Sequence, residues 1–197
     1  MSYRPYRRQG INPIWIIIGV NVVIFFATLI DQNLIFTRFG LIPIFFREAP
    51  WTIFTYMFVH AGWAHIIFNM LTLYFFGTFA MALVGEVSFL TTYFVGGIVG
   101  GLFFLVLAPL TGAQNVFVVG ASGAVYALGG LLVVMRPNTR VLTFPIPIPM
   151  PLWIAILIGF VLVSFYPGVA WQAHLGGIVY GAAVGFYFRQ RERRGRY

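Results

Sequence analysis

The chain has 197 residues, of which 60% are hydrophobic and only 8% are charged, whereas a soluble domain has about 25% charged residues. This composition excludes a soluble globular domain and predicts an all-α polytopic membrane protein with a single domain over residues 1–197. All 12 basic residues are arginine and the net charge is +8, but they cluster outside apolar segments, which is typical of topology signals and argues against a nucleic-acid partner.

Six apolar segments are expected to form transmembrane helices, each of which needs roughly 17–25 residues. In chain order these segments are residues 14–30, 64–84, 87–107, 122–135, 152–165 and 174–188. The fourth is short and rich in small residues, which predicts a central helix that begins below the outer interface, under a space that water could fill. Before the fifth, the alternating Pro145, Pro147, Pro149 and Pro151 predict an extended connector.

The arginines predict the orientation of these helices. Three precede the first helix and five follow the last, which places both termini in the cytoplasm and requires an even number of spans. Arg136 and Arg140 then also fall inside. We therefore expect short basic cytoplasmic tails at 1–10 and 189–197, and a protein of a cell membrane, the inner membrane of a prokaryote. Membrane lipids are expected partners, and a second role of the arginines in holding anionic headgroups stays open.

The long first loop, about 31–63, is too aromatic for a solvated loop. It contains Trp51 and the run Phe54-Thr55-Tyr56. Aromatic rings settle at the membrane interface, so we expect this loop to form short helices in the outer interface.

Polar residues begin the second, fourth and sixth helices, all of which run from outside to inside. His65 and Asn69 share a face of the second helix, Ser122 opens the fourth, and His174 opens the sixth. Taken singly, each fits a helix-packing or helix-pairing role. Those roles predict no common depth, whereas a serine and a histidine at one depth suggest a nucleophile and its base.

Small residues in the last helix favour that contact. Gly177, Gly181 and Gly185 form a repeated small-xxx-small face, which is expected to press this helix against the fourth and bring His174 near Ser122.

Other chemistries lack their residues. No His-Glu-x-x-His motif is present, so a zinc protease has no ligands, and Asp31 is the only aspartate, so a paired-aspartate protease is excluded. The absence of cysteine excludes thiolate metal sites and a cysteine nucleophile. No acid lies within a span. We therefore expect a Ser–His dyad with no metal and no cofactor.

The motif set resembles the rhomboid intramembrane serine proteases over about residues 51–185. It comprises His60-x4-His65-x3-Asn69, Gly120-x-Ser122-Gly123 with Tyr126, and His174-x2-Gly177-x3-Gly181. The resemblance implies a six-helix core in which Ser122 is the nucleophile and His174 the general base. His65, Asn69 and the Ser122 backbone N–H would form the oxyanion hole.

The same resemblance implies the supporting parts. Tyr126 would stack on His174, while His60, Gly120, Gly123, Gly177 and Gly181 would support the site. The fifth helix and the loop 165–172 would be a mobile gate. Substrates would be transmembrane proteins cut near the outer face, at small side chains.

Two positions depart from the family pattern. Thr52 follows Trp51 where arginine is frequent, and Met81 follows Gly77 by four residues where glutamate is frequent; both features concern local packing. Two other functions stay open. One is a non-proteolytic rhomboid-like client binder or chaperone, although such relatives usually lack the serine or the histidine. The other is a small-solute channel or transporter, which the absence of charge along the spans disfavours.

Overall fold

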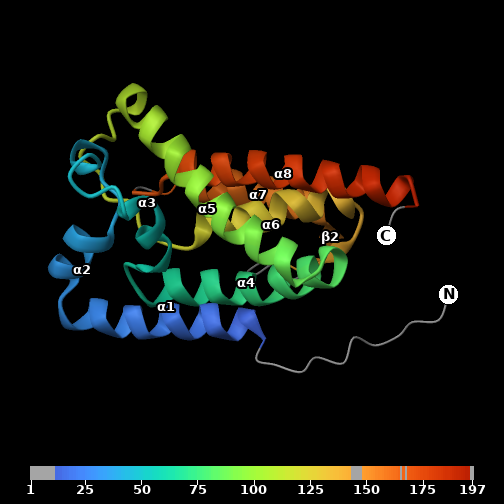
Figure 1. Cartoon of the computed structure of the whole chain (residues 1–197), viewed down its shortest axis with the longest axis horizontal. Coiled ribbons are helices and arrows are strands. Elements are labelled where there is room, and N and C mark those ends of the chain that lie inside the picture. Colours follow the sequence, from blue (N-terminus) through green and yellow to red (C-terminus); the bar gives the residue numbers. More distant parts are fainter. Residues whose placement is uncertain (1–11, 143–147, 165, 167, 196–197) are drawn as a thin grey trace.

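The computed structural model describes residues 12–142, 148–164, 166 and 168–195. Figure 1 shows a bundle of long helices with shorter ones gathered at one end. The long helices are α1 (Pro13–Ile30), α4 (Trp63–Val84), α5 (Glu86–Leu107), α6 (Ser122–Met135), α7 (Leu152–Ser164) and α8 (Trp171–Arg193). The short ones are α2 (Gln32–Phe39), η1 (Pro43–Phe45), α3 (Thr52–Thr55), η2 (Tyr56–Phe58) and η3 (Ala108–Thr111).

All six predicted helices are present. The sixth begins at Trp171 and ends at Arg193, beyond both expected bounds, and the expected end of the fifth, Phe165, lies outside the described residues. Among the residues described, three helical segments are long and apolar enough to cross a membrane: Pro13–Ile30, Trp63–Val84 and Glu86–Thr111. α6 and α7 are shorter apolar helices. The number of spans and the orientation of the termini therefore stay predictions.

The connector before α7 contains a short antiparallel β pair that the sequence did not predict. Strand β1 (Arg140–Val141) pairs with β2 (Met150–Pro151). In a two-stranded pair both strands are edge strands, and an edge strand tolerates a proline such as Pro151, which has no backbone N–H to donate. Pro145 and Pro147 lie outside the described residues.

The first loop forms the short helices that its aromatic content suggested, and it also reaches the residues before α6. The backbone N–H groups of Leu41 and Val118 each donate to the carbonyl of the other, at 3.0 and 2.8 Å. Thr52, one of the two departures from the family pattern, is buried and donates its hydroxyl to the Ala49 carbonyl. The hydroxyl thus closes a local turn within the loop.

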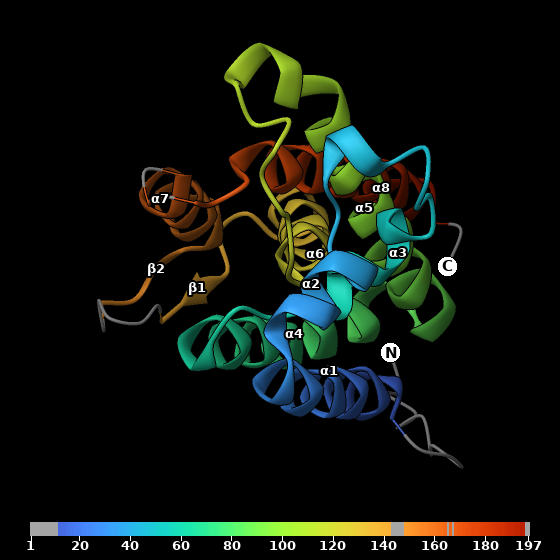
Figure 2. The ribbon, with the colours of Figure 1, turned by 90° about the vertical axis from the view of Figure 1, so that its left-hand side faces the viewer.

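Helix α6 occupies the centre of the bundle, with α4, α5 and α8 around it (Figure 2). Ten of its 14 residues are buried, which confirms the predicted central helix. Its contact with α8 is close because glycines face backbone: a Cβ at Gly177 would strike the Gly123 carbonyl oxygen, and one at Gly181 would strike that of Ala127. These two helices carry Ser122 and His174.

Candidate active site

The structure brings Ser122 and His174 into direct contact. Ser122 begins α6 and His174 lies in the first turn of α8. The His174 Nε2 atom lies 2.7 Å from the Ser122 Oγ atom, within the distance at which a base takes a hydroxyl proton. His174 is only 4% exposed. The arrangement fits a serine nucleophile and its base.

No carboxylate orients the imidazole. The His174 Nδ1 atom is buried and has no hydrogen-bond partner among the described residues. Instead, the ring of Tyr126 lies against it, with centroids 4.5 Å apart and planes 31° apart. Phe160 of α7 in turn meets Tyr126 edge-on at 6.2 Å. Ring packing therefore replaces the third member of a catalytic triad as the support of the base.

On the other side of Ser122, His65 packs on the backbone of Gly120. Gly120 has φ +120°, and a Cβ there would lie 2.7 Å from the His65 Cε1 atom, so only glycine fits. The N–H of Ala61 lies 3.4 Å from His65 Nδ1. Because a backbone N–H can only donate, Nδ1 accepts and the ring proton lies on Nε2. That N–H faces Gly120 and can stabilise a negative charge formed beside Ser122.

Asn69 lies one helical turn after His65 and is buried. Its Nδ2 atom donates to the His65 carbonyl at 2.8 Å, which uses one of its two N–H donors and fixes the plane of the amide. The structure thus ties Asn69 to its own helix and leaves its second N–H as the one that a substrate could use.

His60 supports the backbone immediately before Ser122. It is fully buried, and its Nε2 atom lies 3.5 Å from the Ala121 N–H, which donates to it. Its ring lies 5.0 Å from that of His65. His60 therefore contacts both His65 and the backbone just before α6.

Tyr56 is a further supporting residue, and the sequence did not predict its burial. It belongs to the aromatic run that we expected at the interface, yet it is 1% exposed. Its hydroxyl donates to the Gly97 carbonyl at 2.7 Å, and its own carbonyl accepts from the Gly120 N–H at 2.9 Å. Gly123 lies against its hydroxyl. The paired glycines of α5 were the available signal, because they leave room for a large buried ring.

A second missed contact links the start of α8 to the loop after α5. Gln172, two residues before His174, is buried and donates its side-chain N–H to the Thr111 hydroxyl at 2.8 Å. In the part of the chain that the structure describes, no three His, Asp or Glu side chains gather into a group that could hold a metal.

Comparison with known proteins identifies the family. The rhomboid domain model matches residues 47–191. Rhomboid protein 1, mitochondrial, of Saccharomyces cerevisiae is 28% identical over 195 residues, which are 93% of this chain and 56% of the relative. RHOMBOID-like protein 12, mitochondrial, of Arabidopsis thaliana is 35% identical over 163 residues, 74% of this chain and 47% of the relative. Rhomboid protease GluP of Bacillus subtilis is 32% identical over 132 residues, 66% of this chain and 24% of the relative. The chain thus spans about half the length, or less, of these relatives.

Proposed function

The chain belongs to the rhomboid family, and we propose that it is an intramembrane serine endopeptidase that cleaves transmembrane segments of membrane proteins near the outer face with a Ser122–His174 dyad. The observation that carries this proposal is the 2.7 Å contact between His174 Nε2 and Ser122 Oγ. Membership of a family that includes named proteases supports it.

The chemistry follows from the positions of the groups. His174 takes the Ser122 hydroxyl proton as Oγ attacks the scissile carbonyl, and it returns that proton to the leaving amine. Water then attacks the resulting ester with the same histidine as base. The oxyanion is held by the Ser122 N–H, the His65 Nε2–H and the free Asn69 N–H, and a donor of this kind is worth roughly 10²–10³ in rate.

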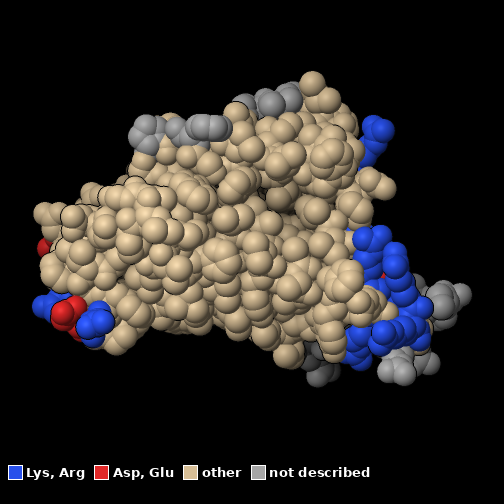
Figure 3. All heavy atoms as spheres, turned by 90° about the horizontal axis from the view of Figure 1, so that it is seen from above, with Lys and Arg blue, Asp and Glu red and all other residues tan. Residues whose placement is uncertain are grey.

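Six spans and cytoplasmic termini are part of this proposal. Figure 3 shows arginines crowded at the end where α8 terminates, with a few mixed charges at the opposite end, a distribution that supports the orientation. Ser122 and His174 both lie at the helix ends remote from that arginine cluster, and hence toward the outer face. We also propose that residues 1–197 form one domain.

The protein is a membrane protein by its family and its apolar helices. Two of the relatives are mitochondrial by name and one is bacterial. These names give no support to the inner membrane of a prokaryote, which was expected from the sequence.

The test is cleavage of a single-span substrate by the purified chain in detergent. The parent is expected to cleave, and Ser122→Ala and His174→Ala are expected to lose cleavage. Ser88→Ala is the matched control, because Ser88 lies at the far end of α5 and should leave the rate unchanged. A fluorophosphonate probe should label the parent and the control at Ser122, but not the His174→Ala variant.

Other outcomes favour the alternatives. If four equally folded proteins leave every substrate intact and react with no probe, the chain is a non-proteolytic client binder. Solute flux through liposomes without cleavage would instead indicate a channel.

A further inference from the structure

An apolar groove lies between α6, α7 and α8, on a flank that the mechanism above does not use. Its volume is about 250 Å³. Its walls include Val133 and Val134 of α6, Ile156 and Phe160 of α7, and Ile178 and Ala182 of α8. Of the residues of α7, only Leu152 and Ala155, in its first turn, are buried. Most of α7 is thus loosely packed, and Figure 2 shows it standing apart from the other helices.

One end of this groove meets the arginine cluster. The carbonyl of Val134, a residue of the groove wall, accepts a hydrogen bond from Arg189 Nη1 at 3.0 Å. A guanidinium has five N–H donors, so this bond leaves donors for an anion. Arg140 is exposed on β1, opposite Pro151, the residue that directly precedes α7. Arginines therefore lie where both helices that flank the groove reach the charged end.

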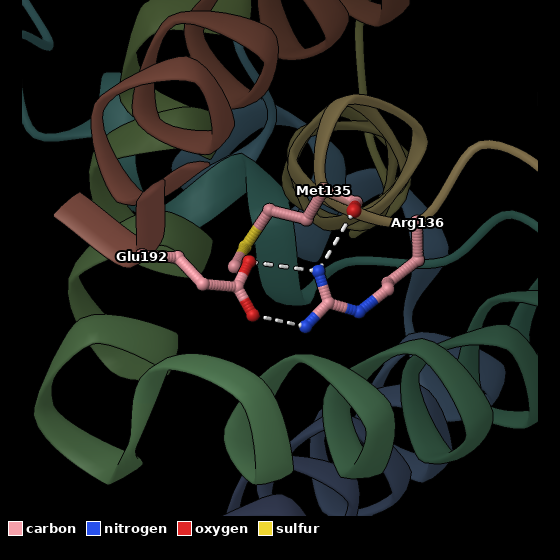
Figure 4. A network of polar contacts seen from close by, with 3 residues as sticks. All are labelled: Met135, Arg136 and Glu192. Carbon is pink, nitrogen blue, oxygen red and sulfur yellow. Dashed lines mark hydrogen bonds and ion pairs between the residues drawn. The ribbon is translucent and has the colours of Figure 1, made fainter. Parts of the chain in front are cut away.

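Glu192 lies at the charged end of the groove, but it does not cancel the positive charge there. Glu192 accepts two bonds from the Arg136 guanidinium, the one to Nη1 being 2.9 Å long (Figure 4). Arg136 also donates to the Met135 carbonyl at 2.9 Å. Glu192 is thus hydrogen-bonded to Arg136, and it also interacts electrostatically with Arg189. One carboxylate cannot offset the charges of Arg136, Arg189 and Arg140. The charged end of the groove remains positive.

We propose that the groove binds one anionic phospholipid, with an acyl chain between α7 and α8 and its phosphate at Arg189. The apolar walls match an acyl chain, and guanidinium groups form charge-assisted bonds with phosphate oxygens. A zwitterionic lipid offers the same chain and phosphate but no net charge, so the arginine cluster selects the anionic one.

The bound lipid acts on the dyad, and this consequence rests on the proposed function. Phe160 is part of the groove wall and also touches Tyr126, which lies on His174. A chain in the groove packs against the side of α7 that the protein leaves uncovered and holds Phe160 in place. The lipid is therefore expected to raise the rate of cleavage without touching the substrate.

The experiment measures lipid binding independently of cleavage. The full chain is placed in nanodiscs of phosphatidylcholine with one fifth phosphatidylglycerol, and native mass spectrometry counts the lipids that stay bound. The parent is expected to prefer phosphatidylglycerol by about fivefold for each arginine engaged. Arg189→Gln should lose most of this preference, whereas the matched control Arg38→Gln, at the opposite end, should keep it. Leu157→Trp, which fills the groove from an exposed position, should lower retention of both lipids.

Equal retention of the two lipids by the parent would overturn the proposal, as would an equal loss in Arg38→Gln or unchanged retention in Leu157→Trp. Displacement of the lipid by a single-span substrate peptide would make the groove a substrate path and would overturn it too. Competition by inorganic phosphate alone, with no dependence on the groove variant, would indicate a simple anion site and also overturn it. Ser122→Ala should bind the lipid as the parent does. The binding experiment therefore tests lipid selectivity independently of protease activity.

Discussion

The close packing of α6 and α8 predicts that one added methyl group at Gly181 will inactivate the protein. A Cβ there would lie 2.6 Å from the Ala127 carbonyl carbon and 2.8 Å from its Cα, whereas ordinary contact begins at 3.4 Å. Both atoms are backbone, so a side-chain rotation cannot relieve the clash. The Ala127 carbonyl oxygen lies closer still. Helix α8 must therefore retreat from α6 by more than about 0.8 Å, and such a shift would lengthen the 2.7 Å contact between Ser122 and His174 beyond about 3.5 Å.

The expected result for Gly181→Ala is a loss of roughly 10²-fold in kcat, which is the scale of a 1 Å misplacement, and a loss of about 1–3 kcal/mol in the free energy of unfolding. The assay is substrate cleavage in detergent beside a thermal unfolding curve. Gly19→Ala on α1 is the matched control, since nothing lies within 4 Å of its Cβ position. Full activity and an unchanged Tm in Gly181→Ala would show that the two helices are not held by this contact.

The remaining predictions concern single side chains. Tyr126→Phe should keep the rate because the ring stays on His174, whereas Tyr126→Ala should lower kcat by up to about tenfold, the worth of one aromatic pair. His65→Ala should lower kcat by roughly 10²-fold with little change in KM, if its Nε2–H binds the oxyanion and not the substrate; a change confined to KM would argue against that role. Arg136 lowers the pKa of Glu192 through a hydrogen bond, so any stability from this half-exposed pair is present above the usual carboxyl pKa and is lost as pH falls through the lowered one. Glu192→Gln should therefore change Tm only slightly at pH 7 and not at all at low pH.

The sequence predicted the helices and the contact between Ser122 and His174 because both depend on local patterns. Apolar length defined six segments, and their alternating direction placed Ser122 and His174 at the same end. Glycines spaced by four marked the face of α8 that packs on α6. The structure bears out these helices and this contact face.

Contacts formed by residues distant along the chain could not be predicted in the same way. Tyr56 lies in an aromatic run that we expected at the interface, but its burial depends on α5. Its side chain lies against Gly100 and Gly101, and its hydroxyl donates to the carbonyl of Gly97, 41 residues later. The bond between Gln172 and Thr111 likewise joins the first turn of α8 to η3, two elements that no sequence periodicity connects. The alternating prolines predicted only an extended chain, and nothing in the sequence indicated that this chain would pair with Arg140 and Val141.

The proposed proteolysis in a membrane makes two opposing demands, and the uneven packing of the bundle matches both. A dyad without a carboxylate depends on the relative position of its two helices and on the Tyr126 ring that lies against His174. Helices α6 and α8 accordingly meet through glycines in close backbone contact. A peptide bond must also reach Ser122 from the lipid, which requires an element that can move. Helix α7 is the element to which we assign that movement, because only Leu152 and Ala155, in its first turn, are buried. Phe160 of α7 contacts Tyr126, which lies against His174, so a movement of α7 is expected to reach the base through these rings. A rigid catalytic pair beside a loosely held helix is thus what the arrangement of small and large side chains along this chain produces.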